Sequence, residues 1–257
     1  MNTRKNDYKV IIWGLGSVGR SALEMINARK SLKLVAAYDV DPQKIGKDAG
    51  EICGFEHAGV TVTNDRVAVL NTEADIALYY ASSIWDEGKL PDLETCQANV
   101  DDIVDLLNHG KNVSTTVDIY YSEKNQPNYF KQIDEAARAN GVTYTQFGIF
   151  PGLFTPYIPT VLAHLSRKIN KVIVYGGQDD SANTAPWVNY LCYGKTVEEI
   201  PAAQFAFLKS LFYTYYGPTV IEITERLGLE YDEYRCEVEQ IPADSEVTTP
   251  NAHITPG

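Results

Sequence analysis

The sequence predicts an α/β protein, with a doubly wound parallel sheet in residues 1–150 and a second, α+β domain in residues 151–257. Short apolar runs alternate with amphipathic stretches over the first 150 residues. Such alternation is typical of parallel strands joined by right-handed crossover helices. A glycine-rich segment follows the first apolar run directly, and the alternation stops at Pro151-Gly152.

Six short β-like runs are predicted to form the strands of this sheet. The first, YKVIIW, is mostly apolar, as expected of a strand that is buried on both faces of a sheet. Six strands alternating with helices fit a doubly wound fold. The strands are predicted over residues 8–13, 32–40, 60–62, 75–80, 111–116 and 142–147.

The intervening stretches are predicted to be helices. Residues 17–29 carry apolar side chains at helical spacing. Residues 42–53 are predicted to form a helix with Asp41 as N-cap and Pro42 at the first helical position. Further helices are predicted over residues 66–70, 99–107 and 129–139.

The second domain is predicted to combine helices with two strands. Helices are expected over residues 156–165 and 197–228, the latter interrupted at Gly217-Pro218, and strands over 171–175 and 230–241. Two strands alone leave exposed edges. We therefore expect either a partner subunit, as in a homodimer, or a natural chain that continues beyond residue 257.

The composition argues against several classes of protein. The chain carries a formal net charge of −12, and an acidic surface repels phosphate backbones, so we expect no nucleic-acid partner. No apolar run reaches the roughly 18 residues of a membrane span, and the N-terminus has no apolar signal segment, so we expect a cytoplasmic protein without membrane association. The four cysteines and four histidines lack metal-ligand spacing, and no metal is expected.

The glycine-rich segment matches G-x-G-x-x-G between a predicted strand and a predicted helix, which is the context of the Rossmann dinucleotide site. The first glycine permits a tight turn, the second lets backbone approach a pyrophosphate, and the third lets helix and strand pack closely. The alternative is a glycine turn without a ligand. The predicted cofactor-binding residues here are Gly14, Leu15, Gly16, Ser17, Val18 and Gly19.

Asp39 ends the second predicted strand, about twenty positions after the last glycine, where a carboxylate binds the ribose hydroxyls of NAD. The same carboxylate would repel the 2′-phosphate of NADP. NAD is therefore the expected cofactor. NADP stays an alternative because Lys44 and Lys47 could reach a 2′-phosphate.

Ligands of doubly wound sheets lie beyond the carboxyl ends of the strands. Loops after the fourth, fifth and sixth predicted strands should therefore surround the nicotinamide. Ordinary turn chemistry is the alternative explanation of their polar residues. The residues predicted to contact the cofactor from these loops are Ala81, Ser82, Thr116 and Gly152.

Asp118, shortly after the fifth predicted strand, is the candidate catalytic residue. A carboxylate beside a nicotinamide can stabilise an iminium cation and take a proton from an ammonium group. The alternative is a helix or turn cap. The predicted substrate pocket consists of Tyr120, Phe150, Phe154, Pro156 and Tyr193.

Four segments, VIIWGLGSVGRSAL, AAYDVDPQKIGKDAGEICG, LNHGKNVSTT and GIFPGLFTP, give the chain a family resemblance from residue 8 to about 199. The chain resembles the native NAD(P)H-dependent amine dehydrogenases and 2,4-diaminopentanoate dehydrogenases of the dihydrodipicolinate-reductase-like group. The resemblance implies reversible reductive amination of a small ketone or aldehyde with ammonia.

The resemblance also bears on single residues. Asp118 stands where that family has a catalytic Glu, and Phe150 stands where Asn or His is frequent, which implies a more apolar pocket. Family chains run further than this one, so a C-terminal portion is expected to be missing. A cyclic imine reductase of the same group and a non-catalytic NAD(P)H-binding sensor are the alternative functions.

Overall fold

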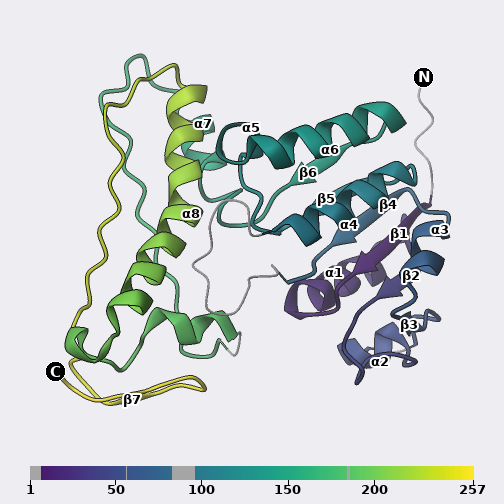
Figure 1. The fold of residues 1–257 in the computed structure, drawn as a ribbon, viewed down its shortest axis with the longest axis horizontal. Coiled ribbons are helices and arrows are strands. Elements are labelled where there is room, and N and C mark those ends of the chain that lie inside the picture. Colours follow the sequence, from purple (N-terminus) through teal and green to yellow (C-terminus); the bar gives the residue numbers. More distant parts are fainter. Residues whose placement is uncertain (1–6, 56, 83–95, 184–185) are drawn as a thin grey trace. The chain divides into compact units, whose positions relative to one another are not determined.

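The computed structural model describes residues 7–55, 57–82, 96–183 and 186–257 (Figure 1). These residues form two compact units. The first ends at Gly152 and the second begins at Leu153.

A parallel sheet forms the centre of the first unit. Its strand order is β3-β2-β1-β4-β5-β6, and each neighbouring pair is parallel. The chain winds outward in one direction from β1 and in the other from β4, so the order reverses between these two strands. The predicted Rossmann-type fold is therefore confirmed. The strands are β1 (Tyr8–Trp13), β2 (Leu32–Tyr38), β3 (Val62–Thr63), β4 (Ile76–Tyr79), β5 (Asn112–Thr115) and β6 (Tyr144–Gln146).

Helices cover both faces of this sheet. Side chains alternate along a strand, and in β1 Val10 and Ile12 belong to one core cluster, whereas Ile11 and Trp13 belong to the other. The first cluster includes residues of α1, and the second includes residues of α3, α4 and α6. The helices are α1 (Ser17–Asn27), α2 (Ala49–Cys53), α3 (Arg66–Asn71), α4 (Gln97–Asn108), α5 (Ser122–Asn125) and α6 (Pro127–Asn140).

The helix predicted over residues 42–53 begins later than expected, at Ala49. Asp41 caps only a turn: its carboxylate accepts a hydrogen bond from the Gln43 amide, but residues 42–46 do not continue as a helix. Gly46 then has a φ of +81°, which is not helical. Asp48 is the observed N-cap and accepts a hydrogen bond from the Gly50 amide at 2.8 Å.

The regular elements of the second unit are mostly helices, and two predictions for it are wrong. The segments predicted as strands are irregular in the structure, namely residues 171–175 and 230–241. Strand-forming residues need a neighbouring strand, and Tyr175 is instead 86% exposed. The elements are α7 (Tyr157–Ala163), the 3₁₀-helices η1 (Pro186–Leu191) and η2 (Val197–Glu199), α8 (Ala202–Arg226), and a hairpin of β7 (Val247–Thr248) and β8 (His253–Ile254).

Helix α8 continues through Gly217-Pro218, where an interruption was predicted. Leu208 and Leu211 before this point and Ile223 after it are all buried. Tertiary packing of one continuous apolar face therefore outweighs the unfavourable proline. None of the described helices, α8 included, combines the length and apolarity needed to cross a membrane.

Candidate functional site

The ends of five strands lie level with one another in the first unit. The register aligns Trp13 of β1 with Tyr38 of β2 and Tyr79 of β4, then Tyr79 with Thr115 of β5, and Thr115 with Gln146 of β6. The loop after each strand therefore begins at the same edge of the sheet. The predicted cofactor residues follow strand ends at this edge in the chain, and Asp118, Tyr120 and Phe150 come within five residues of the ends of β5 and β6.

The glycine loop has the backbone that the sequence motif predicts. Gly14 has a φ of +98°, and a Cβ on it would lie 2.6 Å from the Tyr80 carbonyl oxygen. A Cβ on Gly19 would lie 2.0 Å from the Gly14 carbonyl oxygen. Both positions therefore exclude any side chain. Gly16 is different, because nothing lies within 4 Å of its would-be Cβ and the backbone there stays open to a ligand.

Helix α1 begins at this open position. Its N-cap is Gly16, which offers no side-chain cap, and the first intrahelical bond runs from the Arg20 amide to the Gly16 carbonyl at 2.9 Å. The amides of Ser17, Val18 and Gly19 precede that bond. A helix start of this kind presents N–H groups and a positive dipole end to an anion.

Asp39 lies against the glycine loop. Its Oδ2 accepts from the Leu15 amide at 2.8 Å and from Lys44 Nζ at 2.9 Å, and its Oδ1 accepts from the Asp41 amide at 2.9 Å. Burial alone would raise the pKa of this carboxyl, but hydrogen bonds from the Asp41 amide, Lys44 and the Leu15 amide outweigh burial and lower the pKa. The Asp39 carboxylate therefore stays charged. It holds the glycine loop through the Leu15 amide and forms an ion pair with Lys44.

The remaining predicted cofactor residues lie at the ends of β4, β5 and β6. Ala81, Thr116 and Gly152 are partly buried, and Ser82 is exposed. Gly152 has a φ of +148° and forms a bridge with Gly148, whose carbonyl oxygen would lie 2.1 Å from a Cβ on Gly152. Only glycine fits this position.

Asp118 is buried at 8% exposure, and its Oδ1 accepts a hydrogen bond from the Tyr120 hydroxyl at 3.0 Å. The N-caps of α5 and α6 are Tyr121 and Gln126, so Asp118 is not the N-cap of either helix. The side-chain amide of Gln126 donates a hydrogen bond to the backbone carbonyl of Asp118 at 3.1 Å. Hydrogen bonds from Tyr120 and Gln126 therefore hold Asp118 in the loop after β5.

Tyr121 gives this loop an unusual backbone. Its φ of +49° is left-handed, which is uncommon for a bulky residue. The Asn125 side-chain amide donates to the carbonyls of Tyr120 and Tyr121, each at 3.2 Å, and stabilises the turn.

The predicted substrate pocket divides between the two units. Tyr120 and the partly buried Phe150 belong to the first. Phe154, Pro156 and Tyr193 belong to the second, where the Tyr193 hydroxyl donates to Asp180 Oδ2 at 3.2 Å. Of the predicted pocket residues, Tyr120 forms a hydrogen bond with Asp118. The contribution of the others to a pocket stays a prediction. Among the described residues, no group of three or more His, Cys, Asp or Glu side chains could hold a metal ion.

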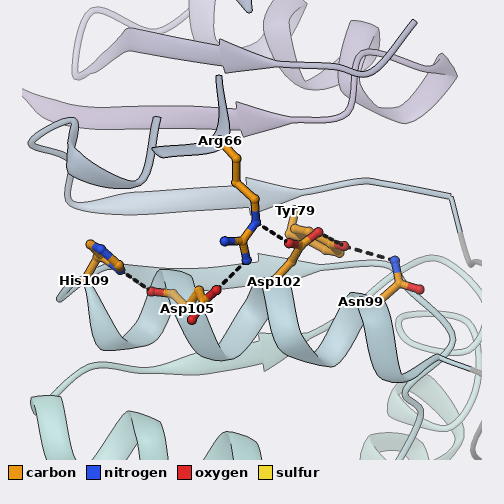
Figure 2. Close-up of polar contacts among 6 residues, drawn as sticks. All are labelled: Arg66, Tyr79, Asn99, Asp102, Asp105 and His109. Atoms are coloured by element: carbon orange, nitrogen blue, oxygen red, sulfur yellow. Dashed lines mark hydrogen bonds and ion pairs between the residues drawn. The ribbon is translucent and has the colours of Figure 1, made fainter. Parts of the chain in front are cut away.

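Sequence reasoning missed a buried polar network beside this edge (Figure 2). Asn99 of α4 is fully buried, and its amide donates to the Tyr79 hydroxyl at 3.0 Å and to the Ser82 carbonyl at 3.2 Å. One signal was available. Asn99 shares the apolar face of α4 with Ile103 and Leu106, four and seven residues later.

Comparison with known proteins gives one family match and several similar proteins. Residues 8–83 match the family described as dihydrodipicolinate reductase, N-terminus. An amine dehydrogenase of Streptomyces virginiae is 27% identical over 243 residues, which are 93% of this chain and 64% of that protein. A 4-hydroxy-tetrahydrodipicolinate reductase of Picosynechococcus sp. is 35% identical over 66 residues, 25% of this chain and 24% of that protein.

Over most of its length the chain is therefore similar to an amine dehydrogenase. This confirms the predicted resemblance to the dihydrodipicolinate-reductase-like group. A solved amine dehydrogenase from Mycobacterium smegmatis has the same fold, with a TM-score of 0.72 at 20% identity over 98% of this chain and 71% of that one. The chain spans less than two thirds of its amine dehydrogenase relative from Streptomyces virginiae.

Proposed function

We propose that the chain acts as an NAD(P)-dependent amine dehydrogenase, which aminates a small ketone or aldehyde reversibly with ammonia. One observation carries the proposal. A buried carboxylate, Asp118, is held by Tyr120 at the same sheet edge as an open glycine loop. The match to an amine dehydrogenase over 93% of the chain supports it.

The residues at this edge fit a dinucleotide. Gly16 leaves space beside the uncapped start of α1, where the diphosphate would bind. Asp39 would accept hydrogen bonds from the ribose hydroxyls. Lys44, which is paired with Asp39, would offer a positive charge to a 2′-phosphate. We therefore propose NAD as the cofactor, with NADP also accepted. When bound, the nicotinamide supplies or accepts the hydride.

Asp118 would act on the protons of the substrate. In the direction of amine oxidation, its carboxylate accepts a proton from the substrate ammonium and stabilises the iminium cation that forms. Water then adds to the iminium carbon, and ammonium leaves to give the carbonyl. In the reverse direction, ammonium and the carbonyl condense to the iminium with loss of water, and the protonated Asp118 returns its proton to the amine that reduction forms. The Tyr120 hydroxyl orients the carboxylate for these transfers.

Steady-state kinetics with short ketones and aldehydes, ammonia and NADH tests the proposal. Asp118→Asn should lower kcat by about 100-fold, because general acid–base catalysis contributes at least this much, while NADH titration stays unchanged. Tyr120→Phe keeps the ring and should lower kcat by about tenfold. Asp134→Asn, on α6 and ion-paired with Arg138, is the control and should behave like the parent. Turnover that survives in Asp118→Asn would remove this residue from the mechanism.

A cyclic imine reductase is the second candidate, favoured by the match of residues 8–83 to the dihydrodipicolinate reductase N-terminus. An imine reductase acts on a preformed C=N bond and needs no free ammonia. Reduction of a cyclic imine, without amination of any carbonyl at high ammonia concentration, would identify this function. Binding of NADH without turnover of either substrate class would indicate a sensor.

A further inference from the structure

Three aromatic residues lie directly before the proposed cofactor loops. Trp13, Tyr38 and Tyr79 are the last residues of β1, β2 and β4, which are neighbours in the sheet. The Trp13 ring lies 4.1 Å from the Tyr38 ring and 6.1 Å from the Tyr79 ring, measured between centroids. Since Trp13 and Tyr79 are almost fully buried, this aromatic row supports the start of the glycine loop and of the loop after β4.

A polar network from α3 and α4 contacts Tyr79 and Trp13 of this aromatic row, and Figure 2 shows its contacts with Tyr79. The Tyr79 hydroxyl donates to Asp102 Oδ2 at 3.0 Å, and Asp102 Oδ1 accepts from Arg66 Nε at 2.9 Å. The Arg66 guanidinium also lies 5.9 Å from the centre of the Trp13 ring, within cation–π range. Burial, and secondly the Asp102 charge, raise the pKa of Tyr79, so its hydroxyl stays a donor.

Asn99 connects this network to the loop after β4. Its side-chain amide donates both to the Tyr79 hydroxyl and to the Ser82 carbonyl. The loop in turn lies against the glycine loop, because the Tyr80 carbonyl and the Ala81 amide nitrogen lie within 2.8 Å of a would-be Cβ on Gly14. A shift of this loop would therefore disturb the Gly14 turn.

We propose that Asn99 is a positioning residue for the dinucleotide. By holding the Ser82 carbonyl it keeps residues 80–82, which follow β4, against the glycine loop, and the Arg66–Asp102–Tyr79 network fixes the Asn99 amide. The inference rests on cofactor binding as proposed above and is independent of the amine chemistry.

NADH titration, followed by nucleotide fluorescence, and amide hydrogen exchange in the absence of cofactor test the proposal on the full chain. Asn99→Ala should weaken NADH binding by about tenfold, which corresponds to the loss of one buried hydrogen bond. It should also speed exchange of the Tyr80, Ala81 and Ser82 amides. Asn108→Ala is the matched control, because Asn108 lies on the same helix and pairs only with Asn140 in the described structure. It should change neither quantity.

Tyr79→Phe provides a second variant in case Asn99→Ala folds poorly. It keeps the buried ring, removes the hydroxyl that orients Asn99, and should weaken NADH binding by about threefold. Unchanged NADH affinity and unchanged exchange at residues 80–82 in both variants, with only a lower melting temperature, would overturn the proposal. A parent protein that does not bind NADH would instead overturn the proposed function.

Discussion

At the scale of single residues, the carboxylate at the proposed ribose site, Asp39, forms an ion pair with Lys44. Asp39 and Lys44 are joined at 2.9 Å, and both side chains are largely buried, at 9% and 20% exposure. A bare carboxylate would repel a 2′-phosphate, but a carboxylate with a lysine counter-charge repels it less. The structure thus adds a partner that the spacing of Asp39 from the glycines did not reveal.

We predict that Lys44→Ala weakens NADP binding by roughly tenfold more than NAD binding, because charge-assisted contacts with phosphate contribute about 1–2 kcal/mol. Titration with both reduced cofactors measures the ratio. Lys47→Ala is the control, since Lys47 is exposed and no described contact joins it to Asp39. An equal effect of the two substitutions on NADP would contradict the assignment to Lys44.

At the scale of elements, the sequence predicted the parts whose structure is decided locally. Largely apolar runs identified β1, β2 and β4, because strands buried on both faces have this composition. The glycine motif predicted the loop at Gly14 and Gly19, where steric exclusion allows no other residue. Asp118 could likewise be placed, because a residue just after a parallel strand must lie at the ligand edge.

Elements that depend on non-local partners could not be predicted in the same way. Residues 171–175 have strand composition but no neighbouring strand among the described residues. Asp41-Pro42 imitates a helix start, whereas the N-cap is Asp48, seven residues later. The hydrogen bond from Tyr120 to Asp118 and the role of Asn99 depend on side-chain geometry that no spacing rule contains.

Helix α2 offers a test at this scale, since its N-cap titrates. Burial opposes ionisation of Asp48, but hydrogen bonds from the Ala58 and Gly50 amides and the contact with His57 lower its pKa to about 2. The pKa of Asp48 in the folded protein therefore lies below the ordinary aspartate value of 3.8. The stabilisation from this group is therefore present above about pH 4 and is lost as the pH falls through 2.

We predict that Asp48→Asn lowers the melting temperature at pH 6 and that the difference from the parent shrinks steadily between pH 4 and pH 2. Asn can still cap the helix, so the variant isolates the charge. Asp65→Asn, at the exposed N-cap of α3, is the comparison. A melting difference for Asp48→Asn that is the same at every pH would contradict the assigned pKa.

At the scale of the whole molecule, the second unit exposes several apolar side chains on and just after α7. Tyr157, Val161 and Leu162 are 54%, 49% and 56% exposed, and Leu165, just beyond the helix, is 83% exposed. Soluble monomers rarely expose contiguous apolar patches of more than a few hundred Å². Burial of such a surface in a self-complementary contact would favour association, because it removes apolar area from water.

We therefore predict a homodimer in solution, with α7 in the contact. Size exclusion with light scattering at micromolar concentration should give twice the chain mass of 28.6 kDa. Leu162→Lys should shift the protein toward the single-chain mass, because an unpaired charge at a buried contact is costly. Val67→Lys, at a 66% exposed position on α3, should leave the mass unchanged. A parent protein that elutes with the mass of one chain, or a Leu162→Lys variant that keeps the dimer mass, would count against this interface.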